Sequence, residues 1–444
     1  MGLKVRSVIY ALVTYTGYTS YSYVLTQREI QQRELEHDRF IDNNSDENKG
    51  DGKSDIDRRW DVLNIHGRFE NPFKEYRPQT LYEFFIMRLI ELSEFGPRGG
   101  VPNSVAQRVE ELKVVQGEGQ SRGVGFGVGV ATENENENGR VQFWRSLRDV
   151  CHKGNNLLSY TWFGQSCGLV HSGGKSFLLD PLFEDRIVHE RFGPKRVVPC
   201  VVNCDEVVKE IKPDYVLVSH DHPDHLGDDS ASKLAQLEHC QWIVPFGIRG
   251  FLEEHDIRGD SIREMQWWER TSIDDEFEIV CLPAMHWSGR KLYDANKSLW
   301  CSFMILRKGR SLFYHGGDTG YTDGVFKKIG EMYGPVKLAA LPIGQYCPEW
   351  HQKPRHISPM ESVKMMHEMG VHKLIGVHWG TFVLSSENYL EPGQLLAQEG
   401  IKEERLNNII VPSQGRTFIM NDSKLDFTKD DEVESEEQMY IKYA

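Results

Sequence analysis

The chain has 444 residues, enough for two or three domains of average size or for one large domain with extensions. Hydrophobic residues make up 39% and charged residues 27% of the sequence, which is typical of a globular protein and excludes a polytopic membrane protein. The formal net charge of -14 excludes binding to nucleic acid through overall positive charge, although most of the excess negative charge lies in residues 28–59, 133–137 and 422–444.

The first predicted element is an uncharged run from residue 7 to residue 25, preceded by Lys4 and Arg6. As a helix it would extend about 27 Å, close to the thickness of the hydrocarbon core of a bilayer. Several Thr, Ser and Gly residues make this run only moderately apolar. Residues 1–27 therefore form a candidate membrane anchor or targeting segment, and a signal-anchor, a mitochondrial targeting sequence and an ordinary helix all remain open.

Three segments have too few apolar residues to build a core. Residues 28–59 contain the polar run NNSDENKGDGKSD and predict a disordered linker. Residues 116–139 are rich in Gly and then repeat Glu and Asn, which predicts a flexible insertion, and residues 421–444 predict an acidic disordered tail. By contrast, the segment TLYEFFIMRLIEL at 80–92 has the apolar spacing of a helix that would pack on the core, lie against lipid or join two subunits.

From about residue 157, short β-branched runs alternate with helical stretches, which is typical of an α/β domain, and we place this domain at residues 60–420. The predicted strands are 176–183, 215–220, 241–246, 278–287, 311–318, 337–344, 373–380 and 408–412. Residues 360–370 predict one of the intervening helices, ended by Gly370. The eight cysteines contain no Cys-x-x-Cys pair, so we expect reduced thiols.

The most informative motif is HDHPDH at 220–225, which follows the apolar residues YVLV. Its imidazole and carboxylate groups are the ligand types that suit zinc, and a carboxylate in the third position can hold a second metal ion beside the first. Three more candidates, His286, Asp318 and His378, lie at the ends of later predicted strands. Because loops at strand ends carry chemistry on a rigid scaffold, the sequence predicts a site for two metal ions that share a carboxylate.

This order of ligand candidates resembles the metallo-β-lactamase superfamily. The resemblance implies an αββα sandwich, here with an N-terminal extension, and two zinc ions (Zn2+) per chain. It also implies the distribution of the ligands: His220, His222 and His286 on the first ion, Asp224, His225 and His378 on the second, and Asp318 between the two.

A narrower resemblance, to the N-acyl-phosphatidylethanolamine-hydrolysing phospholipase D family, extends from about residue 67 to residue 420. The sequence blocks that carry it are GRFENPF (67–73), GPKRVVPC (193–200), SHDHPDHLGDDS (219–230), QWWE (266–269), PAMHWSGRKLYDANKSLWCSF (283–303), GGDTGYTDGVFKKIGEMYGPVKLAALPIGQYCPEW (316–350) and VHWGTFVLSSENYLEP (377–392). One departure is Pro223, which stands where the animal enzymes carry an aromatic residue. Since Pro223 is not a metal ligand, the departure concerns substrate contacts.

The narrower resemblance implies a phosphodiesterase of phospholipase D type that releases an N-acylethanolamine and phosphatidate. It assigns catalytic roles to Asp224, which would orient the attacking water, and to His356, which would contact the phosphate or protonate the leaving group. It also implies a phospholipid substrate at a membrane surface, a homodimer, and no nucleic acid as a partner. We expect a membrane-associated intracellular protein at the mitochondrial inner membrane, with another endomembrane as the alternative.

Two other functions remain open at this point. A different phosphodiesterase of the same superfamily, acting on RNA, would need a basic surface with interleaved aromatic residues, which the sequence lacks. An inactive relative that only binds lipid would be expected to have lost ligands, whereas all seven ligand positions are filled here. Hydrolysis of the N-acylated phospholipid is therefore the favoured function.

Overall fold

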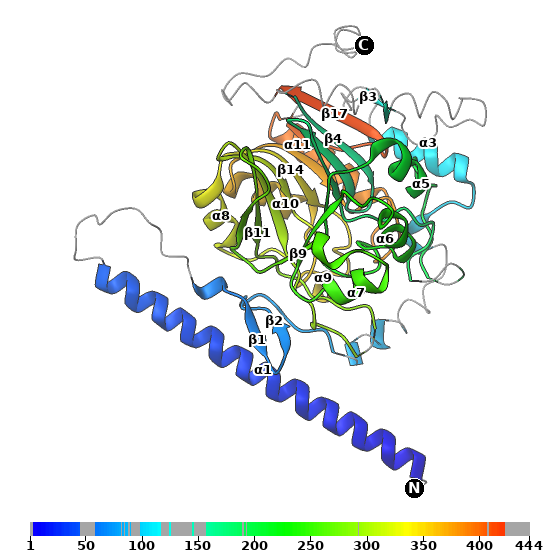
Figure 1. Cartoon of the computed structure of the whole chain (residues 1–444). Coiled ribbons are helices and arrows are strands. Elements are labelled where there is room, and N and C mark those ends of the chain that lie inside the picture. The colour runs from blue at the N-terminus through cyan, green and yellow to red at the C-terminus, as the bar shows by residue number, and fades with distance from the viewer. Residues whose placement is uncertain are drawn as a thin grey trace.

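The computed structural model describes residues 3–44, 58–80, 82–83, 85–87, 89, 98–116, 124–125, 144–145, 157–188, 191, 193–291, 293–405 and 408–421. Two β-sheets form the centre of the molecule, and helices cover their outer faces (Figure 1). This is the αββα sandwich that the resemblance to the metallo-β-lactamase superfamily implied.

The first sheet has eight strands. In spatial order they are β3 (Val124–Gly125), β17 (Arg416–Asn421), β4 (Leu157–Gly164), β5 (Cys167–Ser172), β6 (Lys175–Leu179), β7 (Tyr215–Leu217), β8 (Gln241–Pro245) and β9 (Ile262–Met265). Strands β6 to β9 run parallel to one another, so their carboxyl ends meet at the same edge of the sheet.

The second sheet has seven strands. In spatial order they are β10 (Arg270–Ser272), β11 (Phe277–Leu282), β12 (Ser302–Arg307), β13 (Arg310–His315), β14 (Val336–Pro342), β15 (Val371–Val377) and β16 (Ile409–Ile410). Strands β13 to β16 are parallel. Every predicted strand segment overlaps an observed strand, but β6, β7, β11, β13 and β15 end three to five residues before the predicted ends. The polar residues that follow the apolar runs in the sequence lie in loops, because the hydrogen-bonded pairing between strands ends before it reaches them.

The helices of the described chain are mostly short. They are α1 (Leu3–Asn44), η1 (Arg58–Trp60), η2 (Arg98–Gly100), α3 (Val105–Gln116), α5 (Cys204–Glu206), η3 (Val207–Ile211), α6 (Asp228–Leu234), α7 (Arg249–Glu254), η4 (Gly259–Ser261), α8 (Val325–Tyr333), α9 (Glu349–Gln352), α10 (Pro359–Glu368) and α11 (Glu391–Lys402). The predicted helix at 360–370 corresponds to α10, which begins with a Ser358 and Glu361 capping box.

Alternating side chains bury both faces of the first sheet. Along β6 and β7, Phe177, Leu179 and Leu217 point into the core between the sheets, whereas Leu178 and Val216 point to the cluster that includes residues of α5, α6 and α7. This period of two residues is what a strand covered on both faces requires. The ends of such strands are held rigidly, and the loops that follow them carry the site described below.

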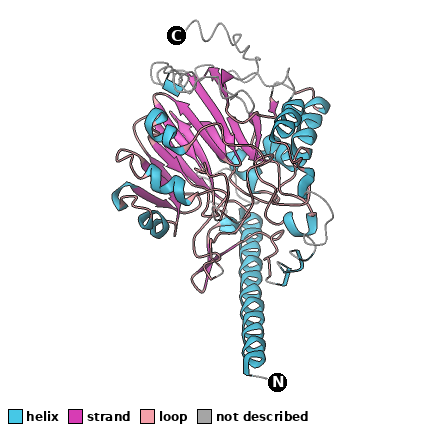
Figure 2. Cartoon of the chain, turned by 90° about the vertical axis from the view of Figure 1, so that its right-hand side faces the viewer, coloured by secondary structure: helices cyan, strands magenta, loops and turns pink. Residues whose placement is uncertain are grey.

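Helix α1 crosses one end of the sandwich beside the hairpin of β1 (Leu63–Ile65) and β2 (Arg68–Glu70), and its N-terminal end extends beyond the body (Figures 1 and 2). The predicted linker at 28–59 is wrong for residues 28–44, which are the second half of this helix. The charged residues there pair along the helix, as in Glu29 and Arg33 at 2.9 Å, while Ile30 is buried. Residues 45–57 lie outside the described residues.

The candidate anchor at 7–25 is helical, but in the part of the chain that the structure describes no helix is both long enough and apolar enough to span a bilayer. Within the predicted helix at 80–92, residues 82, 83, 85–87 and 89 are helical. Of the predicted insertion at 116–139, residue 116 ends α3 and residues 124–125 form β3, while the rest lies outside the described residues.

The predicted tail at 421–444 also lies outside the described residues, apart from Asn421 at the end of β17. Six of the described cysteines are free thiols, as expected: Cys167, Cys200, Cys204, Cys240, Cys281 and Cys301.

Candidate metal centre

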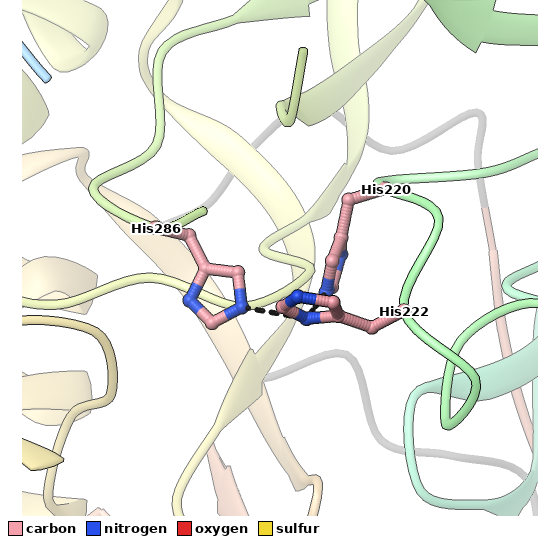
Figure 3. Close-up of side chains that lie close together, drawn as sticks. All are labelled: His220, His222 and His286. Carbon is pink, nitrogen blue, oxygen red and sulfur yellow. Dashed lines mark hydrogen bonds between the residues drawn. The ribbon is translucent and has the colours of Figure 1, made fainter. Parts of the chain in front are cut away.

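The candidate ligands come together at one end of the sandwich, from loops of both sheets. His220, His222, Asp224 and His225 lie between β7 and α6, and His286, Asp318 and His378 follow β11, β13 and β15 respectively. Figure 3 shows His220 and His222 on one loop and His286 on another, with the three rings turned toward one another. The structure thus brings all seven residues into two adjacent groups.

The first group consists of three histidines. The Nε2 atom of His220 and the Nδ1 atom of His222 lie 2.8 Å apart, and the same His222 nitrogen lies 3.2 Å from Nε2 of His286. Two nitrogens that bind one tetrahedral ion at ~2.0–2.1 Å are separated by about 3.3 Å. The three nitrogens therefore converge as the ligands of a single ion would.

The second group consists of Asp224, His225, Asp318 and His378. The two carboxylate oxygens of Asp318 face different partners: Oδ2 lies 3.1 Å from Nε2 of His225, and Oδ1 lies 3.1 Å from Nε2 of His378. Asp318 Oδ2 also lies 3.7 Å from Nε2 of His286 in the first group. Asp318 therefore stands between the groups, the place that a shared ligand must occupy.

His356, the second candidate catalytic residue, lies in the loop between α9 and α10. Its Nδ1 is 3.7 Å from Oδ2 of Asp318, and its ring packs against the rings of His286 and His378. It is buried and forms a third group with His286 and Asp318 that is able to hold a metal ion. The structure therefore places it at the border of the two main groups.

Buried hydrogen bonds orient the histidine rings. Asp180, which directly follows β6, accepts from Nδ1 of His225 and from Nε2 of His315, each at 2.8 Å. Nδ1 of His286 lies 2.9 Å from the carbonyl oxygen of Arg355, to which it donates. Because Nδ1 carries the hydrogen in His225 and His286, their Nε2 lone pairs are directed at the centre. The sequence analysis did not identify Asp180, because nothing in the local sequence indicates that it bonds His225 and His315.

Burial sets the charge of the first group. It lowers the pKa of His222 to about 4 and of His286 to about 3, and it lowers the pKa of His220 well below its usual value. In the second group burial also opposes the charged form of His378, but the neighbouring carboxylates of Asp318 and Asp224 raise its pKa to about 9. The first group thus presents neutral imidazoles, the form that binds zinc.

Gln165, in the turn between β4 and β5, is a further polar residue of the site that the sequence analysis missed. Its Nε2 lies 2.8 Å from Nε2 of His378 and 3.0 Å from Oδ2 of Asp224, to which it donates. Gln165 is buried with a φ of 51°, and its backbone oxygen accepts from the backbone nitrogen of His378. A lone glutamine in a turn carries no motif, so only the fold reveals it.

The donor set fits transition-metal ions. Within the described residues, Nε2 of His222 is buried without a hydrogen-bond partner, and Oδ1 of Asp318 is buried and makes no well-aligned hydrogen bond although Nε2 of His378 lies 3.1 Å away. Leaving such atoms unpaired costs about 1–3 kcal/mol each, and an ion bound between the groups would satisfy the carboxylate oxygen. Nitrogen and carboxylate ligands in this ratio are those of zinc, iron and related metals.

Comparisons with known proteins identify the family to which the chain is similar. Residues 175–379 match the model of the Beta-lactamase superfamily domain. The chain is 39% identical over 417 residues to the mitochondrial N-acyl-phosphatidylethanolamine-hydrolyzing phospholipase D of Saccharomyces cerevisiae, and the match covers 91% of this chain and 86% of that protein. It is 36% identical to N-acyl-phosphatidylethanolamine-hydrolyzing phospholipase D 1 of Caenorhabditis elegans, over 57% of this chain and 74% of that protein.

A solved structure is also similar. Igni18, a metallo hydrolase from Ignicoccus hospitalis, aligns with a TM-score of 0.46 at 22% identity, and the alignment covers 60% of this chain and 98% of that one.

Proposed function

Because the chain belongs to the N-acyl-phosphatidylethanolamine-hydrolysing phospholipase D family, we propose that it hydrolyses N-acyl-phosphatidylethanolamine to an N-acylethanolamine and phosphatidate. Water attacks phosphorus, the bond between phosphorus and the ethanolamine oxygen breaks, and that oxygen leaves with a proton. The observation that carries the proposal is Asp318, whose two carboxylate oxygens face different histidines between two groups of metal-ligand type.

The bound metals in this proposal are two zinc ions. His220, His222 and His286 would hold the first, Asp224, His225 and His378 the second, and Asp318 would contact both. Zinc bound there would supply a water whose pKa falls to about 7 and would offset the negative charge of a phosphodiester. Zinc rather than iron follows from the closed-shell ion's suitability for hydrolysis without redox chemistry.

The side chains around the two groups then divide the remaining tasks. Asp224 would orient the attacking water through its carboxylate, which Gln165 holds by a hydrogen bond of 3.0 Å. His356 lies on the Asp318 side of the centre and would contact a phosphate oxygen or protonate the leaving oxygen. Each of these groups is held by buried neighbours, so little reorganisation is needed during the reaction.

The substrate would reach the site from a bilayer surface. Large apolar side chains are exposed on α1 and among the helical residues 82, 83, 85–87 and 89, including Tyr10, Val13, Phe85, Ile86 and Leu89. The two segments are in contact: the ring of Tyr15 packs on that of Tyr82, and the Thr16 hydroxyl is hydrogen-bonded to the Tyr82 hydroxyl at 2.7 Å. An exposed apolar surface of this kind favours the headgroup and acyl boundary of a membrane.

This apolar surface is also connected to the metal centre. The buried carboxylate of Glu83 accepts from Arg77 and lies 2.6 Å from Nδ1 of His351. Glu83 also lies 3.7 Å from Arg355, whose backbone oxygen accepts from His286. Glu83 and Arg355 thus link the segment that carries these exposed side chains to the proposed metal ligand His286.

For the cellular location, we extend to this chain what the name of the yeast relative says, which is mitochondrial. We place the protein at the mitochondrial inner membrane, with another endomembrane as the alternative. The homodimer stays a prediction. Subcellular fractionation with antibody detection, together with cross-linking of the intact protein, tests both statements.

The test of the proposed function is mass spectrometry of the products from a mixed-phospholipid digest, with and without a chelator. We expect N-acylethanolamines and phosphatidate in equal amounts, and no products after chelation unless zinc is returned. The protein with His222 replaced by alanine serves as the control preparation. Unchanged N-acylated phospholipid in the presence of fully metallated protein would contradict the proposal.

A further inference from the structure

A groove lies between α1 and residues 70–78, which begin with the last residue of β2. It encloses about 90 Å³ and is partly open to solvent, so it can hold an amide group and a few methylene groups but not a whole lipid. Most of the lining that projects into it is aromatic or apolar, including Tyr18, Tyr23, Phe73 and Tyr76. Such a lining suits an acyl chain better than a polar ligand.

Two buried polar atoms in this lining have no partner in the described part of the chain. They are Oδ1 of Asn71, a residue that is 1% exposed, and Oγ of Ser22, which is 7% exposed. The amide orientation of Asn71 is fixed, because its Nδ2 donates to the carbonyl oxygen of His286 at 2.7 Å. Asn71 therefore offers a hydrogen-bond acceptor, and the Ser22 hydroxyl offers a donor.

An unpartnered acceptor and an unpartnered donor among apolar side chains form the complement of a secondary amide that carries an alkyl chain. Burying each atom without a partner costs about 1–3 kcal/mol, so a ligand that satisfies both is favoured. An ammonium group fits less well, since it has three donors and a charge that an apolar lining does not compensate. The groove also adjoins the metal centre, because Asn71 holds the backbone of His286.

We propose that this groove binds the N-acyl amide of the substrate. The amide N–H donates to Oδ1 of Asn71, the amide carbonyl accepts from Oγ of Ser22, and the acyl chain lies between the tyrosines of α1 and Phe73. This inference rests on the proposed function and deepens it, because it names the residues that distinguish an N-acylated headgroup from a free amine.

One neighbour could reverse that preference. Glu70 also lines the groove, and a carboxylate there would attract an ammonium group. Its burial raises its pKa to about 7, so the charged form is disfavoured in this position. If the groove instead takes the free amine, replacing Glu70 by glutamine would weaken the binding of phosphatidylethanolamine headgroups, and this outcome would overturn the proposal.

The test compares two ligands that differ only at the amide nitrogen, N-decanoylethanolamine and its ester analogue 2-hydroxyethyl decanoate. Binding to the full-length protein is measured by isothermal titration calorimetry. We expect the wild type to prefer the amide by about tenfold, the value of one hydrogen bond to a buried acceptor. The ester lacks the N–H but keeps the carbonyl. Loss of the Asn71 contact should therefore weaken only the amide, whereas loss of the Ser22 contact should weaken both ligands.

The Asn71→Leu variant should reduce the amide-to-ester ratio to about one, whereas Ser22→Ala should weaken both ligands by a similar factor of about two to ten and keep the ratio. Ser20→Ala, at an exposed position on the same helix, is the matched control and should change neither affinity. Zinc content is measured for each preparation. Because Ser22 lies on α1, away from His286, its variant remains informative if Asn71→Leu loses metal.

Two failures can be told apart. A wild-type protein that does not hydrolyse N-acyl-phosphatidylethanolamine contradicts the proposed function. A protein that hydrolyses it, but whose amide-to-ester ratio is near one in the wild type or unchanged in Asn71→Leu, overturns the assignment of the groove alone.

Discussion

The metal centre and the groove beside α1 are linked by Asn71, which donates to the backbone of His286, yet they hold their polar atoms in different ways. At the metal centre, loops from both sheets interlock through Asp180 and Arg355, so one side chain fixes the next. In the groove, Asn71 and Ser22 each present a single unpartnered atom among apolar side chains. The proposed catalytic residues thus lie in loops of the sandwich, whereas the residues proposed to select the lipid lie on α1 and directly after β2.

This division implies that the two regions can be damaged separately, beginning with the metal ligands. Asp318→Asn, or His222→Ala, should lower hydrolysis by at least about 1,000-fold, because each variant removes a ligand from the centre. Activity is measured by product formation and metal by mass spectrometry of the intact holoenzyme. Circular dichroism should show the secondary structure of the wild type.

Turnover within tenfold of the wild type in either variant would refute the assignment of the ligands. The wild-type preparation provides a second check, because well under two zinc ions per chain in fully active protein would refute the two-metal proposal.

The buried contacts behind the ligands should have a smaller effect. Asp180→Asn replaces an acceptor shared by His225 and His315 and should reduce metal affinity or activity by about 10–100-fold. Competition with a zinc chelator measures the affinity. Asp214→Asn is the matched control, since Asp214 is an acceptor of hydrogen bonds from Ser176 at the other end of the same sheet. Equal losses in the two variants would show that the effect is general destabilisation.

The lipid-facing side of the molecule should respond in membrane binding alone. Replacing Phe85, Ile86 and Leu89 together by serine should weaken sedimentation with phospholipid vesicles by about tenfold, because three exposed apolar side chains are lost. Hydrolysis of a small soluble phosphodiester should stay at the wild-type rate. The matched control replaces Met360 and Ile401, which are exposed on α10 and α11. Vesicle binding that falls equally in both proteins would contradict the assigned surface.

A separate effect, on stability, concerns Glu70, whose burial raises its pKa from 4.5 to about 7. The folded state therefore holds this proton more tightly than the unfolded state, and the stabilisation is complete below about pH 4.5 and lost as the pH rises through about 7. Glu70→Gln should match the wild type at pH 4.5 and exceed its free energy of unfolding by up to about 3 kcal/mol at pH 8. Thermal melts at the two pH values measure the difference.

The opposite sign, with the wild type more stable than Glu70→Gln at pH 8, would mean that the carboxylate has a favourable charged partner. The difference in free energy of unfolding between the two proteins at pH 4.5, which should be close to zero, provides the internal reference.

Sequence reasoning was most informative where a strand runs directly into its chemistry. His286, Asp318 and His378 each follow a run of buried apolar residues, so their convergence could be predicted from the α/β pattern and the resemblance. Asp180 also follows such a run, but nothing local indicates that it bonds His225 and His315, and Gln165 lies in a turn without any motif. The importance of both arises from contacts between loops that are far apart in the chain. Only the packed sandwich brings these partners together.

Helix α1 shows the opposite limit. Composition indicated a linker from residue 28, because charged residues outnumber apolar ones there. The segment is nevertheless helical to Asn44, since Ile30 is buried, Glu34 pairs with Lys74 and Arg33 donates to the backbone of Asp61. Contacts with a segment more than twenty residues away stabilise the helix despite its local composition. Such contacts cannot be predicted from the local sequence.

The distribution of the ligands over several loops has a consequence for how the protein matures. The first is His220 and the last is His378, and both sheets must be paired before the two groups can form. A nascent chain, a splice variant that omits one strand, or a proteolytic fragment would hold an incomplete set of ligands. Tight metal uptake therefore becomes a late checkpoint in biosynthesis, and the stoichiometry of bound metal serves as a direct assay of correct assembly in any preparation of this protein.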